Sequence, residues 1–60
     1  MTVKEFKETD LYKIAIQVNY FDLTGMNISN KPSFILDLFQ VIGAVYNPDT
    51  SIDVTVNYLN

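Results

Sequence analysis

Cysteine, histidine and arginine are all absent from this sixty-residue chain. Without cysteine the chain cannot form a disulfide, and without both cysteine and histidine it lacks the usual ligands of a structural zinc ion. The same absences remove the residue types that most often act as general acids, general bases or nucleophiles, and the usual clamp for anions. We therefore expect a non-enzymatic protein with no catalytic residue, no cofactor and no metal site.

Positive charge is scarce, because the chain has four Lys but seven Asp and Glu residues and a net charge of −3. Proteins that bind nucleic acid neutralise phosphates with clustered Lys and Arg. The charged residues are concentrated in residues 4–13, whereas residues 14–60 are lightly charged and mildly acidic. This distribution argues against direct nucleic-acid binding and suits a surface that contacts another protein.

Long hydrophobic runs are missing as well. The longest nearly apolar stretch, residues 34–46, is interrupted by Asp37 and Gln40. It is shorter than the ~20 residues that an α-helix needs to span a bilayer. The N-terminus is polar and charged where a secretory signal would be apolar. We therefore expect no membrane association and a cytoplasmic location.

The chain is short enough to form one small domain, 1–60, which buries only roughly 60% of the surface that its unfolded form exposes. Small domains usually gain stability from disulfides, from a metal ion or from association with another chain. The first two are excluded, and 48% of the residues are hydrophobic. We therefore expect self-association as a homodimer, and the alternative is a lone monomer with idealised packing.

Two segments of similar sequence, Ile16–Phe21 and Val54–Leu59, alternate apolar and polar residues and run on into tyrosine. A period of two is typical of a strand with one buried face. The two segments therefore mark the principal strands. Phe21 and Leu59 occupy the equivalent position on the polar side, where they could form an apolar spot that a partner covers.

The same alternation predicts a strand over residues 11–21 and a last strand over residues 51–59. A short strand at residues 44–46 and a turn at residues 47–50, with proline at its second position, complete a β-hairpin with the last strand. The side chains expected on the core face are Tyr12, Ile14, Ile16, Val18, Tyr20, Ile52, Val54, Val56 and Tyr58.

The opening segment, residues 2–8, fits two structures. Thr2 and Glu5 fit a capping box, and Val3 and Phe6 would then share one side of a short helix. Alternatively, the mixed charges of the segment would protect an exposed edge strand from unwanted pairing. We favour the strand.

A helix is predicted from Pro32 to about Ile42, with Gly43 as its C-terminal cap. Its apolar side chains span an arc of roughly 220°, whereas a surface helix needs little more than about 100° to cover a sheet. The helix could be sunk into its own core, or it could contact the sheet on one side and a second chain on the other. We favour the second arrangement. The side chains on the arc are Val41, Phe34, Leu38, Ile42, Ile35, Phe39 and Leu36.

The predicted order of elements is therefore β-β-α-β-β, or β-α-β-β if the opening segment is helical, with residues 22–30 as a loop. This is an α+β fold with a three- to four-stranded, mainly antiparallel sheet and one helix on one face. The expected interface residues are Ile35, Leu36, Phe39, Phe21 and Leu59.

Three kinds of function are compatible with these features. The first, which we favour, is a protein-binding module that occupies a surface of a larger target. The second is a small regulatory or assembly subunit, similar to an antitoxin, that binds one co-encoded partner. The third is a very small enzyme or ligand carrier, which would need a defined pocket.

In its size, acidity, Asn-rich and Arg-free composition and compact α+β pattern, the chain resembles very short proteins with which phages block bacterial defence systems. The Hachiman anti-defence family is one such group. The resemblance is one of type over the whole chain and assigns no role to an individual residue. It implies a homodimeric inhibitor that binds a bacterial defence protein in the host cytoplasm.

Overall fold

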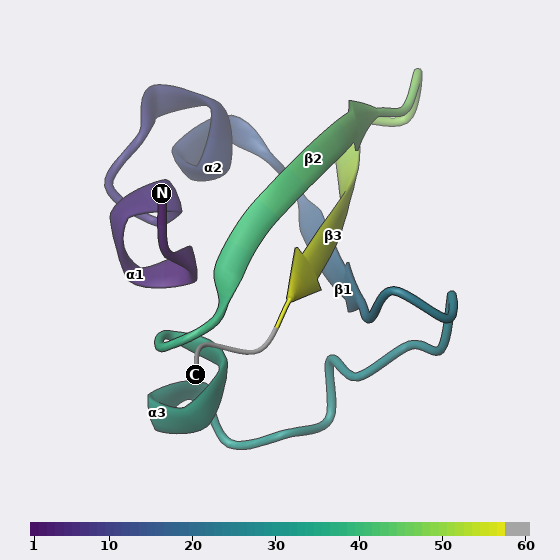
Figure 1. Cartoon of the computed structure of the whole chain (residues 1–60). Helices are drawn as coiled ribbons and strands as arrows, with labels where there is room; N and C mark the ends of the chain where they lie inside the picture. Colours follow the sequence, from purple (N-terminus) through teal and green to yellow (C-terminus); the bar gives the residue numbers. More distant parts are fainter. Residues whose placement is uncertain (58–60) are drawn as a thin grey trace.

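The computed structural model describes residues 1–57 and shows a mixed three-stranded sheet with three short helices (Figure 1). In chain order, the elements are α1 (Val3–Phe6), α2 (Asp10–Ile14), β1 (Gln17–Phe21), α3 (Ser33–Leu36), β2 (Gln40–Tyr46) and β3 (Ser51–Asn57). The predicted α+β class is confirmed. The order of elements differs from both predicted orders, because two helices precede the first strand.

Strand β3 lies at the centre of the sheet, between β1 and β2. It pairs in parallel with β1 and antiparallel with β2. The prediction of a mainly antiparallel sheet is therefore correct for β2 and β3 but wrong for β1 and β3. Side chains alternate between the two faces in both kinds of pairing, so the local sequence pattern could not distinguish them.

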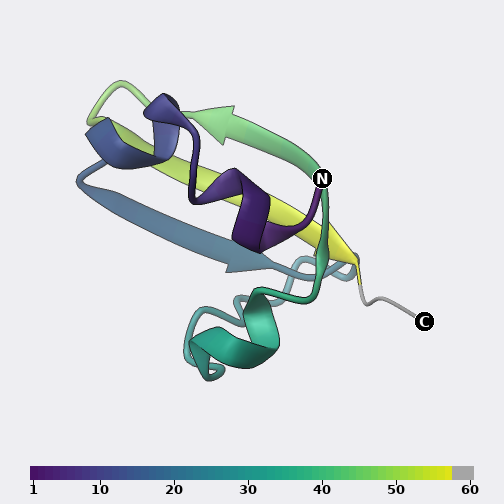
Figure 2. The ribbon, with the colours of Figure 1, turned by 90° about the vertical axis from the view of Figure 1, so that its left-hand side faces the viewer.

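The core lies on one face of the sheet, where α1 and α2 cover it (Figure 2). From β3, Ile52, Val54 and Val56 point into this layer and are almost completely buried, as predicted. Full burial of such a side chain stabilises a fold by about 1.5–3 kcal/mol. The other buried apolar residues are Val3, Phe6, Tyr20, Ile28, Leu36 and Phe39.

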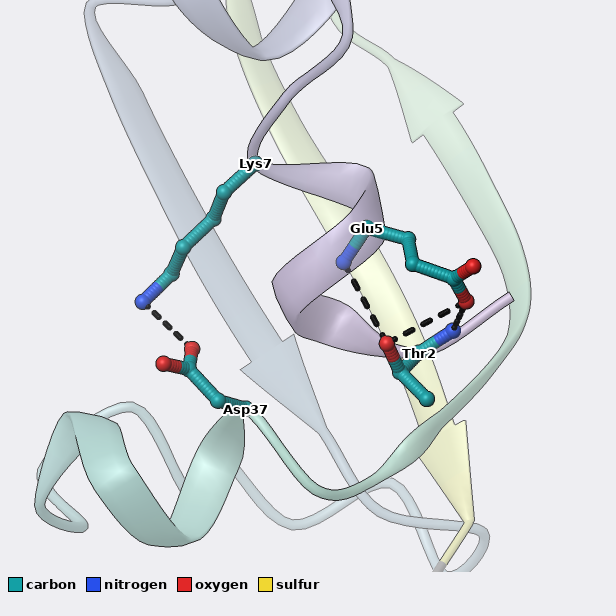
Figure 3. A network of polar contacts seen from close by, with 4 residues as sticks. All are labelled: Thr2, Glu5, Lys7 and Asp37. Atoms are coloured by element: carbon teal, nitrogen blue, oxygen red, sulfur yellow. Dashed lines mark hydrogen bonds and ion pairs between the residues drawn. The ribbon is translucent and has the colours of Figure 1, made fainter.

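The opening segment forms the helix α1 and not the strand that we favoured. The amide of Glu5 donates to Thr2 Oγ1 at 3.2 Å, and the amide of Thr2 donates to Glu5 Oε1 at 2.8 Å (Figure 3). This capping box satisfies donors that the first turn of a helix leaves free. Val3 and Phe6, three residues apart, then both point into the core.

The second helix, α2, replaces the first part of the strand predicted over residues 11–21. Thr9 precedes it as the N-cap, and its Oγ1 accepts a hydrogen bond from the amide of Tyr12 at 3.3 Å. A threonine cap of this kind favours a helix start over continued extended chain. The chain returns to an extended conformation at Ala15, so β1 begins only at Gln17.

This change alters which side chains of the segment form the core. Ile14 and Ile16 are exposed, although the alternation predicts them as core residues. Tyr20 is buried, and Val18 is partly buried against the core. Tyr12 also lies beside the core, where its ring meets that of Phe6 edge-on at a centroid distance of 5.8 Å.

The long helix predicted up to Ile42 does not form. The helix α3 is a single turn, and the chain then enters β2, which contains Gly43 opposite Thr55, next to a β-bulge. Valine, isoleucine and tyrosine fit the pleated surface of a sheet well, and here the contacts with β3 decide the structure. The surplus apolar arc, which depended on a long helix, therefore has no counterpart.

The predicted hairpin is confirmed. The amide of Asn47 donates to the carbonyl of Ser51, and the amide of Thr50 donates to the carbonyl of Asn47, both at 3.0 Å. Thr50 has φ of 66°, which places a β-branched residue in the left-handed region. A turn followed by a left-handed residue is a common way to connect two strands, although glycine is the usual residue there.

Candidate protein-binding surface

The outer edge of β2 is open along most of its length (Figure 2). The N-terminal segment covers only its start, where the amide of Val41 donates to the carbonyl of Met1 at 2.7 Å and Thr2 bridges Gln40. Among the described residues, β3 is the only strand paired with residues 43–46. The backbone groups that point away from β3 are therefore available to another strand.

At the opposite edge of the sheet, formed by β1, the loop that follows the strand covers its end. The amide of Ile28 donates to the carbonyl of Tyr20 at 2.7 Å, and the amide of Asp22 donates to the carbonyl of Met26 at 3.0 Å. The amide of Tyr20 donates to Ser29 Oγ at 2.8 Å. The loop therefore covers β1 from Tyr20 onward, whereas within residues 1–57 no strand pairs with the outer edge of residues 43–46 in β2.

Residues 42–46 of β2 are exposed and mostly apolar. Ile42 is 59% exposed and Val45 is 61% exposed, and Tyr46 is also on the surface. The strand contains no charged residue. Edge strands usually carry a lysine, a proline or another device that prevents pairing, so this strand is suited to pairing with another chain.

A second apolar feature lies on α3 and on the turn that follows it. Phe34 is 72% exposed and Leu38, four residues later, is 61% exposed. Leu36 and Phe39, between and beside them in the sequence, are buried in the core. We call Phe34 and Leu38 the α3 pair.

Polar contacts fix the end of α3 against α1. Lys7 Nζ lies 2.8 Å from Asp37 Oδ1 (Figure 3). The amide of Lys4 donates to the carbonyl of Asp37 at 3.3 Å, and the amide of Val3 donates to the carbonyl of Phe39 at 2.9 Å. The α3 pair is therefore presented by a turn that is anchored through both backbone and side chains.

The face of the sheet opposite the core carries polar side chains. Asp53, on the central strand, accepts hydrogen bonds from Asn19 Nδ2 at 3.3 Å and from Asn47 Nδ2 at 3.2 Å. Asn47 Nδ2 also donates to Ser51 Oγ at 3.0 Å. The polar groups of these side chains therefore form hydrogen bonds with one another. Within residues 1–57, no group of three or more Asp, Glu, His or Cys is arranged to hold a metal ion.

A small cavity of about 330 Å³ lies between α2, β1 and α3. It is bordered by Lys7, Lys31 and Tyr20, and the Tyr20 hydroxyl is buried without a hydrogen-bond partner among residues 1–57. Burial, together with the nearby Tyr12 and Asp37, raises the pKa of Tyr20 to about 12. At neutral pH this hydroxyl therefore stays protonated and cannot act as a base.

The structure separates the five predicted interface residues. Leu36 and Phe39 belong to the core, Ile35 packs partly against it, and Phe21 is half-buried at the end of β1. Leu59 lies outside the described residues. Leu36 and Phe39 therefore contribute to the stability of one chain, and they offer little surface to a second chain.

The exposed apolar residues of β2 and the α3 pair were not predicted as interface residues. The signal that could have identified β2 is its uncharged run rich in β-branched residues directly before the turn at residues 47–50. We assigned only residues 44–46 of this run to a strand. The α3 pair could not be separated from its buried neighbours, because almost every residue in that stretch is apolar.

Within residues 1–57, the helices are all too short and insufficiently apolar to cross a membrane. Comparison of the chain with family models, with curated proteins and with solved structures found no significant match in any of the three.

Proposed function

We propose that the chain is a non-enzymatic protein-binding module that works as a homodimer and blocks a larger bacterial protein. The observation that carries this proposal is the α3 pair, Phe34 and Leu38, which projects from an anchored turn. Grouped apolar residues on the surface of a small protein are typical of sites that contact other proteins.

Burial of the α3 pair against a target would contribute favourable free energy of binding. Burial of each side chain in a pocket of the target would contribute on the order of 1.5–3 kcal/mol. A few buried anchors of this kind provide most of the affinity in many interfaces. Because the backbone hydrogen bonds from Lys4 to Asp37 and from Val3 to Phe39 already hold the turn in place, little ordering would be needed on binding.

The resemblance to short phage anti-defence proteins suggests the class of target. It supports a bacterial defence protein, which the chain would meet in the cytoplasm of the host. If the chain is instead a regulatory or assembly subunit of the antitoxin type, the same pair would bind one co-encoded partner. The two functions differ in the protein that is captured and in the effect on phage growth.

A plaque assay tests the anti-defence function. Bacteria that carry the Hachiman defence system express the chain and are infected with a phage that the system restricts. We expect the wild type to restore plaque formation and the double variant Phe34→Ser, Leu38→Ser to lose this effect. The control is Leu11→Ser, Ile14→Ser, which removes exposed apolar residues from α2.

The outcomes of this assay separate the parts of the proposal. If the wild type restores no plaques, the proposed block of this defence system is wrong. If both double variants restore plaques as the wild type does, the assignment of the α3 pair is wrong. Circular dichroism confirms that the variants are folded, and affinity purification from the same strain identifies the target that the α3 variant loses.

A further inference from the structure

We propose that β2 pairs antiparallel with β2 of a second copy, around a two-fold axis at Val45, so that two three-stranded sheets become one continuous sheet. This inference rests on the homodimer in the proposed function and assigns its interface. It places the contact between copies away from Leu36 and Phe39, which are buried within one chain.

The direction of the backbone groups in β2 determines the register. The amide of Asn47 points toward β3, because it donates to the carbonyl of Ser51. In an antiparallel pair these directions alternate along the strand, and the register from Tyr46 back to Gly43 is regular. The N–H and C=O groups of Tyr46 and Ala44 therefore point outward, to the open edge.

A two-fold axis at Val45 uses all of these groups. It places Ala44 opposite Tyr46 of the second copy, and Tyr46 opposite Ala44, so that each pair exchanges two backbone hydrogen bonds. The two Val45 side chains then face each other at a position without hydrogen bonds, where side chains approach most closely. No outward N–H or C=O of Ala44 or Tyr46 is left without a partner.

The side chains of β2 are compatible with this arrangement. The large Tyr46 ring lies opposite the small Ala44 side chain, on the face that carries the core. The two Val45 side chains meet on the other face. Because residues 40–46 carry no charge, the pairing brings no like charges together within the strand, although each chain has a net charge of −3.

The nearest carboxylates of the two copies are also too far apart to oppose the pairing by charge repulsion. Asp53 lies on the strand next to Val45, so its counterpart in the second copy would be three strand spacings away, or about 14 Å. This exceeds the distance of about 8–10 Å over which salt screens exposed charges at physiological ionic strength. In each copy Asp53 also accepts hydrogen bonds from Asn19 and Asn47.

The free edge is also short, which limits what can occupy it. Met1 and Thr2 cover the start of the strand, and the turn at residues 47–50 ends it. A two-fold axis at Val45 pairs only residues 44–46 of each copy, and these residues lie between the two ends of the free edge. The small domain would gain buried apolar surface in return.

A cysteine cross-link tests this arrangement, because the natural chain contains no cysteine. In Val45→Cys the two thiols would face each other across the axis, with Cβ atoms about 4.5–5.5 Å apart, close to the separation in a disulfide. The control is Ile16→Cys, at a residue that is more exposed but lies just before β1, away from the edge formed by β2. We expect oxidised glutathione to cross-link Val45→Cys at least about tenfold faster than Ile16→Cys.

A proline variant provides a second, independent test. Ala44→Pro removes an N–H that points to the open edge, so it should preserve the fold and raise the dimer dissociation constant about tenfold or more. In Val45→Pro, by contrast, the lost N–H points toward β3, so this variant should destabilise the fold itself. Light scattering measures the mass, and circular dichroism measures the fold.

The results distinguish this inference from the proposed function. A monomeric wild type at micromolar concentration overturns both the homodimer and the pairing of β2. If the wild type is a dimer, but Ala44→Pro remains an equally tight dimer and Val45→Cys cross-links no faster than Ile16→Cys, then the β2 interface is wrong and the homodimer stands. A dimer that is lost in Ala44→Pro and trapped in Val45→Cys supports the inference.

Discussion

The ammonium group of Lys7 and the carboxylate of Asp37 form an ion pair 2.8 Å long that joins the end of α1 to the end of α3 (Figure 3). Both side chains remain about one quarter to one third exposed. A pair in this position is screened by water and salt. It acts together with the backbone hydrogen bond from Lys4 to Asp37, which lies in the same contact.

Replacement of this lysine should therefore have a small effect that depends on salt. We expect Lys7→Met to lower the free energy of unfolding by about 0.5 kcal/mol at low ionic strength and by less in high salt. Urea denaturation measures both values. Lys13→Met, on the exposed side of α2, is the matched control, and an equal loss in the two variants would contradict a specific role for the ion pair.

Thr50 is the residue whose replacement should stabilise the chain. Its φ of 66° is unfavourable for a β-branched residue but not for glycine. We expect Thr50→Gly to raise the free energy of unfolding by about 1 kcal/mol, measured by thermal denaturation. Thr24→Gly changes another exposed threonine and should give no gain, because the φ of Thr24 is not positive and its hydroxyl donates to Asp22.

The capping box at the start of α1 should contribute measurably to stability. In Thr2→Ala the amide of Glu5 loses its acceptor, so we expect a loss of about 1 kcal/mol in the free energy of unfolding. Thr2→Ser keeps the oxygen and should retain most of the stability, as urea denaturation can show. If serine and alanine behave alike, the cap does not stabilise the helix.

Stability should decrease in acid, in part because of Asp22. Hydrogen bonds, chiefly from the side chain of Thr24 and also from the amide of Met26, hold the pKa of Asp22 below its ordinary value of 3.8. A carboxylate whose pKa is lower in the folded state stabilises the fold above its unfolded pKa, and this contribution is lost as the pH falls through the folded pKa. Stability should therefore fall as the pH drops below 3.8.

The variant Asp22→Asn tests this origin of the pH dependence. We expect it to be less stable than the wild type at neutral pH, and we expect the difference to shrink in strong acid, where the wild type is protonated as well. Chemical denaturation over a pH series measures the difference, with Glu8→Gln as a control at another exposed acid. A difference that stays constant with pH would show that the charge of Asp22 is not its cause.

Some parts of the fold could be predicted because local chemistry determines them. Ile52, Val54 and Val56 alternate with polar residues over a full strand, and Pro48 and Asp49 indicate the turn before it. These signals agree with the tertiary structure. The buried face of β3 and the hairpin were therefore predicted correctly.

Other parts depend on contacts between segments that are distant in the sequence. The stretch from Phe34 to Tyr46 is apolar almost throughout, so neither a helical nor a strand period stands out. Pairing with β3 makes its second half a strand, which the local pattern does not show. For the same reason the local pattern does not show that the exposed apolar residues lie on β2 and on the α3 pair.

The central position of β3 has a consequence for folding kinetics. β3 provides every strand-to-strand contact of the sheet, and its pairing with β1 closes a long loop, from Gln17 to Ser51. Sheets with such non-local contacts fold slowly, because chain entropy is lost before the contacts form. If β3 detaches, β1 and β2 both lose the one strand that pairs with them within residues 1–57. If only β1 detaches, the β2–β3 hairpin that is left is marginally stable on its own, so partial opening of the sheet should have no stable intermediate. The amide protons of the sheet that are bonded between strands should therefore all show one common free energy of exchange, that of global unfolding.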